Sequence, residues 1–224
     1  MSQIIFALDV STEEEALYFV DLLKDHVSMF KIGLELFINC GLDTVRKVSE
    51  RAPVFLDLKL HDIPNTVIRS INALKDLNVE YLTVFMDNNI SRVVKDVSTN
   101  IKLLTVHVLT SSGMGPGAAA IIKTGILISK FSGVAGSICP GSELKEARKL
   151  VGNDFLLITP GIRLASDSAH DQANIITPKR AILDGANKIV VGRSIRLAQD
   201  PVSVAKQINN QIQEALEEVS SDAE

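Results

Sequence analysis

Short β-branched stretches alternate with longer amphipathic stretches from one end of the 224-residue chain to the other. This alternation is typical of a parallel sheet whose strands are joined by crossover helices. We predict eight strands, each followed by a helical segment: Gln3–Asp9, Met29–Gly33, Val54–Lys59, Tyr81–Phe85, Leu103–Leu109, Gly133–Ile138, Phe155–Thr159 and Lys188–Gly192. Eight βα units without a linker or a change in composition favour one α/β domain over residues 1–224, closed as a (β/α)8 TIM barrel rather than opened as a doubly wound sheet.

Local signals mark where several of the predicted helices begin. Ser11 and Glu14 have the spacing of a capping box. Thr177 and Asp200 each stand before a proline, which places a capping side chain ahead of a first-turn proline. The acidic residues from Glu214 onward are interpreted as the frayed end of the last helix, with no function implied.

The amino-acid composition and the net charge limit the kinds of molecule that the protein is expected to bind. Hydrophobic residues make up 46% of the chain, which is enough for a full core in one domain. The 23 lysines and arginines are outnumbered by 27 aspartates and glutamates, which gives a net charge of -4. We therefore expect no nucleic-acid partner, although the balance leaves room for a local phosphate pocket.

The chain also lacks the sequence signals of export and membrane insertion. Its first residues lead into the strand-like run Gln3–Leu8 without a basic segment, so no signal peptide is expected. Two lysines interrupt the most apolar stretch, Ala118–Ile138, and no uninterrupted run approaches the roughly 20 residues of a membrane span. Cys40 and Cys139 stand apart from each other, which favours buried, reduced thiols. These features predict a cytoplasmic protein without a membrane partner.

The third predicted strand carries two opposite charges. Its period-two alternation turns Val54, Leu56 and Leu58 toward the helices, and it turns Phe55, Asp57 and Lys59 into the barrel. Charge inside a barrel is costly unless it is paired and lies at the wet carboxyl-terminal mouth, where barrel enzymes hold their active sites. We interpret Asp57 and Lys59 as catalytic. The alternatives are a structural ion pair, or a register slipped by one residue that exposes both charges.

Two neighbouring strand ends add charge at the same place. Asp9 closes the first predicted strand, and Lys31 lies near the end of the second, which is adjacent to the third in a barrel. Taken alone, Asp9 could cap the next helix and Lys31 could be a surface lysine that extends to solvent. Their joint placement favours four charged groups that converge at the barrel mouth.

Seven short motifs are spread over almost the whole chain. They are FALDV at Phe6–Val10, FKIGLELF at Phe30–Phe37, DLKLHDIPNT at Asp57–Thr66, VLTS at Val108–Ser111, TPGIR at Thr159–Arg163, DQ at Asp171–Gln172 and VGRSI at Val191–Ile195. Together, and through DLKLHDIPNT above all, they resemble orotidine 5'-monophosphate decarboxylase of the bacterial type. The resemblance implies conversion of orotidine 5'-monophosphate to uridine 5'-monophosphate and CO2, the last step of de novo pyrimidine nucleotide synthesis, without a metal or an organic cofactor.

The resemblance also implies roles for the four charged groups. Lys59 is the proton donor, and Asp57 lies beside the substrate carboxylate. Lys31 and Asp9 hold the array and the ribose. These residue types suit the chemistry, because loss of CO2 leaves a carbanion at C6 of the pyrimidine that needs a fixed positive charge and then a proton, and an ammonium group supplies both.

A further implication of the resemblance is a homodimer with shared active sites. Asp62 reaches in from the partner subunit, so that Lys59 lies between Asp57 and Asp62. Ile63 and Thr66 come from the same partner loop.

Phosphate binding is expected on the loops after the seventh and eighth strands, where barrel enzymes often bind phosphate. Gly192 permits close approach of the backbone, and Arg193 can make a bidentate contact. Gln172 lies on the long loop of residues 161–176 and can close over the phosphate as a neutral donor, which makes that loop a candidate lid. The alternatives are a surface salt bridge for Arg193 and a solvent-exposed loop position for Gln172.

Further substrate contacts are expected near the pyrimidine. Thr110, just past the fifth strand, matches the hydroxyl residue of the family that contacts the base and the carboxylate region. Ser111 takes its place if the register is off by one, and either residue could be a plain helix cap. Pro160 shapes the base pocket or only breaks the strand, and Arg163 of the TPGIR motif is assigned to the substrate.

The sequence departs from the family pattern in two places. Asn174 replaces a basic residue two positions after the glutamine, and the segment 85–87 (Phe-Met-Asp) replaces a turn that contains histidine. These departures affect the contacts of the lid and the wall near the fourth strand, and leave the charged array intact. The four histidines have no metal-ligand spacing, and His61 is interpreted as a structural member of its motif.

Three other classes of protein remain as rivals. A sugar-phosphate lyase such as a keto-gulonate phosphate decarboxylase or a hexulose phosphate synthase also carries a DxKxxD strand, but it uses magnesium and has an acidic residue where Lys31 stands. A ribulose-phosphate epimerase needs His and Asp ligands on several strand ends, which are missing here. A barrel kept only as a binding module has no reason to turn Asp57 and Lys59 inward.

Overall fold

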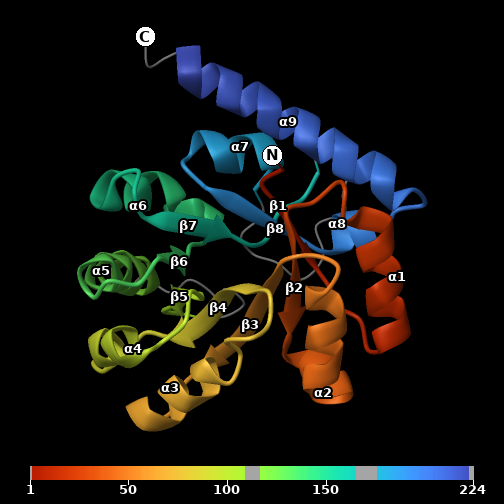
Figure 1. The fold of residues 1–224 in the computed structure, drawn as a ribbon. Helices are drawn as coiled ribbons and strands as arrows, with labels where there is room; N and C mark the ends of the chain where they lie inside the picture. The colour runs from red at the N-terminus through yellow and green to blue at the C-terminus, as the bar shows by residue number, and fades with distance from the viewer. Residues whose placement is uncertain (1, 109–116, 165–175, 222–224) are drawn as a thin grey trace.

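The computed structural model describes residues 2–108, 117–164 and 176–221. Eight parallel strands close into a barrel in sequence order, which confirms the predicted TIM barrel (Figure 1). The strands are β1 (Ile4–Ala7), β2 (Met29–Gly33), β3 (Val54–Leu60), β4 (Val79–Phe85), β5 (Lys102–Val106), β6 (Gly136–Ile138), β7 (Leu156–Thr159) and β8 (Lys188–Val191).

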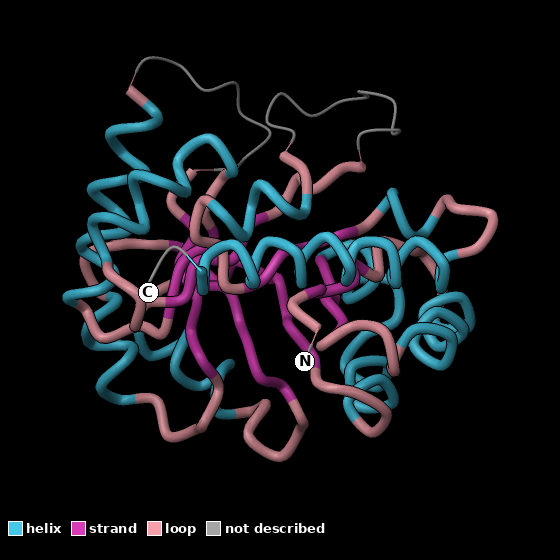
Figure 2. The backbone as a smooth tube through the Cα atoms, turned by 90° about the horizontal axis from the view of Figure 1, so that it is seen from above, coloured by secondary structure: helices cyan, strands magenta, loops and turns pink. Residues whose placement is uncertain are grey.

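Helices surround the strands on the outside in Figure 1, and Figure 2, seen from above, shows helices on both sides of the strands. They are α1 (Glu13–Leu23), α2 (Leu34–Ser49), α3 (Pro64–Asn72), α4 (Ile90–Asp96), α5 (Ala118–Phe131), the 3-10 turn η1 (Gly141–Glu143), α6 (Leu144–Val151), α7 (Pro178–Leu183), α8 (Arg193–Arg196) and α9 (Pro201–Ser221). The last helix packs against α1, α7 and α8. Within the described ranges, no helix has both the length and the apolar character that a bilayer span requires.

The strands divide the core into two layers, as their period-two pattern predicts. The layer between sheet and helices contains Val54 and Leu56, with Leu58 packed against it. The layer inside the barrel contains Phe55 with Ile5, Ala7, Met29, Tyr81, Leu104, Ile158 and Val190. The register predicted for β3 is therefore confirmed, and Asp57 and Lys59 continue the inward face of that strand.

Only β2 has the predicted bounds at both ends, and the boundaries of the other strands differ from the prediction by one to three residues. The fourth strand begins at Val79, two residues earlier than predicted. The sixth begins at Gly136 rather than Gly133, because Gly133 has φ of +82° and belongs to the left-handed turn that ends α5. Strand β1 ends at Ala7, so Asp9 lies just beyond it.

The predicted N-caps of α7 and α9 are confirmed, and the predicted N-cap of α1 is wrong. Thr177 Oγ1 accepts from the N–H of Arg180, and Asp200 Oδ1 accepts from the N–H of Ser203. At α1 the cap is Thr12, whose Oγ1 accepts from the N–H of Glu15 at 3.3 Å. The predicted capping box of Ser11 and Glu14 is therefore one residue too early, and the Ser11 hydroxyl instead donates to Glu35 on α2 at 2.6 Å.

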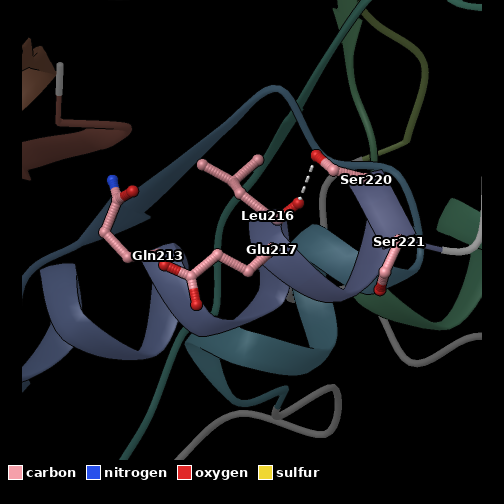
Figure 3. Close-up of a pocket in the computed structure, with 5 residues that line it drawn as sticks. All are labelled: Gln213, Leu216, Glu217, Ser220 and Ser221. Carbon is pink, nitrogen blue, oxygen red and sulfur yellow. Dashed lines mark hydrogen bonds between the residues drawn. The ribbon is translucent and has the colours of Figure 1, made fainter.

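From the sequence, the acidic tail is interpreted as a frayed helix end, but α9 continues as a helix to Ser221. That interpretation is therefore wrong for the residues up to Ser221. Lys179 on α7 makes ion pairs with Glu214 and Glu218, and the hydrogen bond that Lys179 donates to Glu218 raises the pKa of Lys179. A shallow hollow over the last turns of α9 is lined by Gln213, Leu216, Glu217, Ser220 and Ser221, all from that one helix (Figure 3). Asp222 and Glu224 lie outside the described residues.

The two cysteines are free thiols in different surroundings. Cys139 is buried, as predicted, and burial raises the pKa of its thiol to about 12. Cys40 on α2 is only partly buried, so the expectation of a buried thiol is wrong there. Its Sγ lies 3.8 Å from the carbonyl oxygen of Ser11.

A buried polar cluster fills the space between β5, β6 and α5. Thr105 Oγ1 lies 2.8 Å from Ser129 Oγ and 2.5 Å from Ser137 Oγ. His107 Nε2 lies 3.3 Å from Ser137 Oγ. The imidazole rests against Gly125, where an added Cβ would lie 2.3 Å from Nδ1. Burial lowers the pKa of His107 to about 4, so the ring is neutral in the folded protein at neutral pH.

We expect His107 to make the fold sensitive to acid. The unfolded chain binds a proton at His107 with the ordinary pKa of 6.5, whereas the folded protein does so only near about 4, so the free energy of unfolding falls as the pH drops between these values. Between near pH 7 and near pH 5, wild type should lose roughly 2 kcal/mol more than His107→Gln. Urea unfolding of both proteins at both pH values measures this difference, and an equal loss in the two proteins would contradict it.

Candidate active site

Four charged side chains meet at the carboxyl ends of β1, β2 and β3. Lys31 Nζ lies 3.0 Å from Asp9 Oδ1 and 3.8 Å from Asp57 Oδ2. Lys59 Nζ lies 2.8 Å from Asp57 Oδ1. The structure thus brings together the four groups that the sequence predicted to converge, in the order Asp9, Lys31, Asp57 and Lys59, with charges of alternating sign. This series is called the charged array below.

Burial changes along the charged array. The side chains of Lys31 and Asp57 are 11% and 18% exposed, whereas those of Lys59 and Asp9 are 31% and 54% exposed. The middle of the array is therefore shielded from water, where electrostatic interactions are stronger, and solvent reaches both ends. A ligand that enters the mouth of the barrel can replace this water at Lys59 and Asp9.

Two glycines leave room for the charged array. A Cβ added at Gly33 would lie 3.1 Å from Lys31 Nζ, so the absence of a side chain lets the ammonium group lie over the end of β2. A Cβ added at Gly192 would lie 3.5 Å from Asp9 Oδ2. The turn that follows β8 is therefore adjacent to the array.

The backbone of β3 is irregular at the charged residues. Leu56 pairs with Leu82 and Leu60 pairs with Val84, so residues 57–59 stand opposite the single residue Thr83 of β4. This bulge places Lys59 at φ of +50°, a left-handed conformation that residues other than glycine rarely adopt. Strained backbone of this kind occurs most often at functional sites.

Thr83 is a member of the site that the sequence interpretation missed. Its Oγ1 accepts from the backbone N–H of Lys59 at 2.9 Å and donates to Asp57 Oδ1 at 3.0 Å. The available signal was an inward-facing threonine on the strand next to the two charges, two residues beyond Tyr81 on the same face.

The residues that follow β3 are exposed, and among the described residues they make no ion pair with the charged array of their own chain. Asp62 is exposed and its Oδ1 accepts from the N–H of Ile63, and among the described residues it makes no ion pair with Lys59. Ile63 is 67% exposed, and Thr66 in the first turn of α3 is exposed as well. His61 packs against Phe85 with ring centroids 5.2 Å apart.

The expected phosphate region is described in part. Gly192 caps the short helix α8, and Arg193 is its first residue and is half-buried. Pro160 follows β7, and Arg163 is 7% exposed, with its Nη1 donating to the carbonyl of Ile162 at 2.8 Å. Thr110, Ser111, Gln172 and Asn174 lie outside the described residues, together with most of the candidate lid of residues 161–176.

A closed (β/α)8 barrel with a lysine and aspartate array at its carboxyl-terminal mouth defines a TIM-barrel enzyme. The family described as "Orotidine 5'-phosphate decarboxylase / HUMPS family" matches residues 2–208. The chain therefore belongs to this family and is an enzyme of the class for which its curated relatives are named.

Individual relatives align with this chain over almost their whole length. The orotidine 5'-phosphate decarboxylases of Desulfosudis oleivorans and of Wolbachia pipientis (from Culex pipiens) are 38% and 40% identical to this chain. The alignments cover 95% and 93% of this chain and 94% and 97% of the relatives. The crystal structure of orotidine 5'-phosphate decarboxylase from Lactobacillus acidophilus superposes with a TM-score of 0.80 at 33% identity, over 95% of this chain and 99% of the other.

Proposed function

We propose that this enzyme decarboxylates orotidine 5'-monophosphate to uridine 5'-monophosphate and CO2, as the last step of pyrimidine nucleotide synthesis in the cytoplasm. The observation that carries the proposal is the charged array of Asp9, Lys31, Asp57 and Lys59 at the barrel mouth. No metal or organic cofactor is required in this proposal, because the chemical step needs only a fixed positive charge and a proton.

Lys59 is the proposed proton donor. Loss of CO2 leaves an electron pair on C6 of the pyrimidine, and an ammonium group next to that carbon stabilises the developing charge before it transfers a proton. The 2.8 Å contact with Asp57 fixes the direction of the Lys59 side chain, so little reorganisation is needed when charge develops. The ammonium group is also partly exposed to the mouth, where a substrate can reach it.

Asp57 and Lys31 have supporting roles in the same proposal. Asp57 lies beside the substrate carboxylate, where like-charge repulsion raises the free energy of the ground state, although we rank stabilisation of the carbanion first. Lys31 contacts both Asp9 and Asp57 and holds them in a fixed arrangement. Asp9, the most exposed of the four, is left for the ribose hydroxyls.

The phosphate of the substrate is assigned to the turn after β8. Arg193 supplies a bidentate contact, Gly192 permits close approach of the backbone, and Gln172 closes over the phosphate. The closeness of Gly192 to Asp9 supports this assignment, because it puts the phosphate next to the ribose end of the charged array. The base and its surroundings are assigned to Thr110, Pro160 and Arg163. Ser111 is the alternative to Thr110.

Asp62, Ile63 and Thr66 are assigned to the site of a partner subunit in a homodimer. Asp62 makes no ion pair with Lys59 of its own chain within the described residues, as expected if it serves another site. The 67% exposure of Ile63, a large apolar side chain at the rim of the mouth, also supports burial by a second subunit.

The purified enzyme should consume orotidine 5'-monophosphate in the presence of a strong chelator at the same rate as in its absence. The decrease in ultraviolet absorbance of the substrate measures the reaction, with release of CO2 as an independent readout. No turnover with or without added magnesium would refute the proposal. Activity that disappears with the chelator and returns with magnesium would favour the sugar-phosphate lyases of the same superfamily.

A further inference from the structure

The hydroxyl of Thr83 joins two parts of β3 that the bulge separates. Opposite residues 57–59, β4 offers the single residue Thr83, so the N–H of Lys59 is taken out of the regular pairing between the strands. The Thr83 hydroxyl replaces the missing ladder acceptor at 2.9 Å. Thr83 is fully buried, so water does not compete for these contacts.

The same hydroxyl also fixes the carboxylate of Asp57. Because Oγ1 accepts from the N–H of Lys59, its proton is directed to Asp57 Oδ1 at 3.0 Å. Oδ1 therefore receives two donors, the Thr83 hydroxyl and the ammonium group of Lys59 at 2.8 Å. Oδ2 is left to face Lys31 at 3.8 Å. One side chain thus sets both the plane of the Asp57 carboxylate and the left-handed backbone of Lys59.

We propose that Thr83 is a positioning residue of the decarboxylase, which holds Asp57 and Lys59 in the geometry of the chemical step without touching the substrate. This inference rests on the proposed function, because it assumes that Asp57 and Lys59 act on the reacting carbon. Thr83 works through two hydrogen bonds and contributes neither charge nor a proton to the reaction. Its loss should therefore lower the rate of the chemical step and leave binding of the nucleotide unchanged.

Thr83→Val tests the inference, because valine keeps the shape of the side chain and removes only the hydroxyl. We expect kcat to fall by about 10- to 100-fold, as for misplacement of reacting groups by a fraction of an ångström to an ångström. The Kd of uridine 5'-monophosphate, measured by calorimetry, should change by less than about threefold, since the phosphate contacts lie on another strand. Thr83→Ser restores the hydroxyl and should recover most of kcat.

Thr105→Val is the matched control. Thr105 is a fully buried threonine on the adjacent strand β5, and its hydroxyl also makes short contacts to two buried groups, Ser129 and Ser137. It makes no hydrogen bond to the charged array. We expect Thr105→Val to lower the Tm about as much as Thr83→Val while it keeps kcat within about threefold of wild type.

The outcomes separate the two proposals. Wild type without decarboxylase activity refutes the proposed function, and with it the assumption on which this inference rests. Active wild type together with Thr83→Val at wild-type kcat refutes the role of Thr83 alone, as does an equal loss of kcat in Thr105→Val. If Thr83→Val does not fold, Thr83→Ala and Thr83→Ser decide, because a positioning hydroxyl predicts a large difference in kcat between them at equal affinity for the product.

Discussion

Lys59→Ala is expected to abolish turnover while the protein still folds and still binds uridine 5'-monophosphate. Removal of a general acid typically costs about 10²- to 10⁴-fold in rate, and in the proposed mechanism the same group also supplies the positive charge next to the carbanion. Stopped-assay or ultraviolet measurements at saturating substrate give kcat, and calorimetry with the product gives the Kd. A variant that keeps more than about a tenth of the wild-type kcat would remove Lys59 from the role of proton donor.

Lys188→Ala provides a control with an inward-facing lysine at the opposite end of the barrel. Lys188 begins β8, its ammonium group donates to Ser28 Oγ at 3.0 Å, and burial lowers its pKa. Its loss removes a similar side chain from the barrel interior far along the strand from the mouth. We expect kcat near that of wild type, so that a loss in Lys59→Ala alone reflects the chemistry at the mouth rather than disturbance of the barrel.

The direction of the charged side chains could be predicted from the sequence because a strand has a strict period of two. Both faces of β3 begin with apolar residues, Val54 and Leu56 on one face and Phe55 on the other, so apolar residues alone do not show which face points inward. The charges of Asp57 and Lys59 identify the inward face, because charge in a barrel is expected at its mouth. The bulge at residues 57–59 has no such signal, because the left-handed backbone of Lys59 depends on a hydroxyl from another strand. Long-range partners of this kind are set by tertiary structure.

The N-cap of α1 also depends on a contact with another element, so the sequence alone does not determine it. Ser11 and Thr12 are adjacent and both are good helix caps, so the sequence offers two starts for α1 that differ by one residue. The choice falls on Thr12 because the Ser11 hydroxyl already donates to Glu35 of α2. At Thr177 the following proline leaves a single start, and the prediction is confirmed there.

The shared site of the proposed homodimer gives a second large effect. Asp62→Ala, like Lys59→Ala, should be nearly inactive as a homodimer, since every site then lacks one of the two groups. In a mixed dimer, one site carries both defects, while the other takes Lys59 from one chain and Asp62 from its partner and is intact. If random exchange makes about half of all dimers mixed, activity should recover to about a quarter of that of wild type.

The exposed position of Asp62 is the structural reason to expect this recovery, because its carboxylate is directed to the N–H of Ile63 and not to Lys59 of its own chain. The experiment unfolds and refolds the two variants together, with different affinity tags that prove exchange of subunits. Lys59→Ala mixed with Asp57→Ala is the matched control: both residues lie on β3 of one chain, so mixing leaves every site defective and should restore nothing. Were Asp62 to act within its own chain, the test pair would behave like this control, and absence of recovery despite proven exchange would refute the shared site.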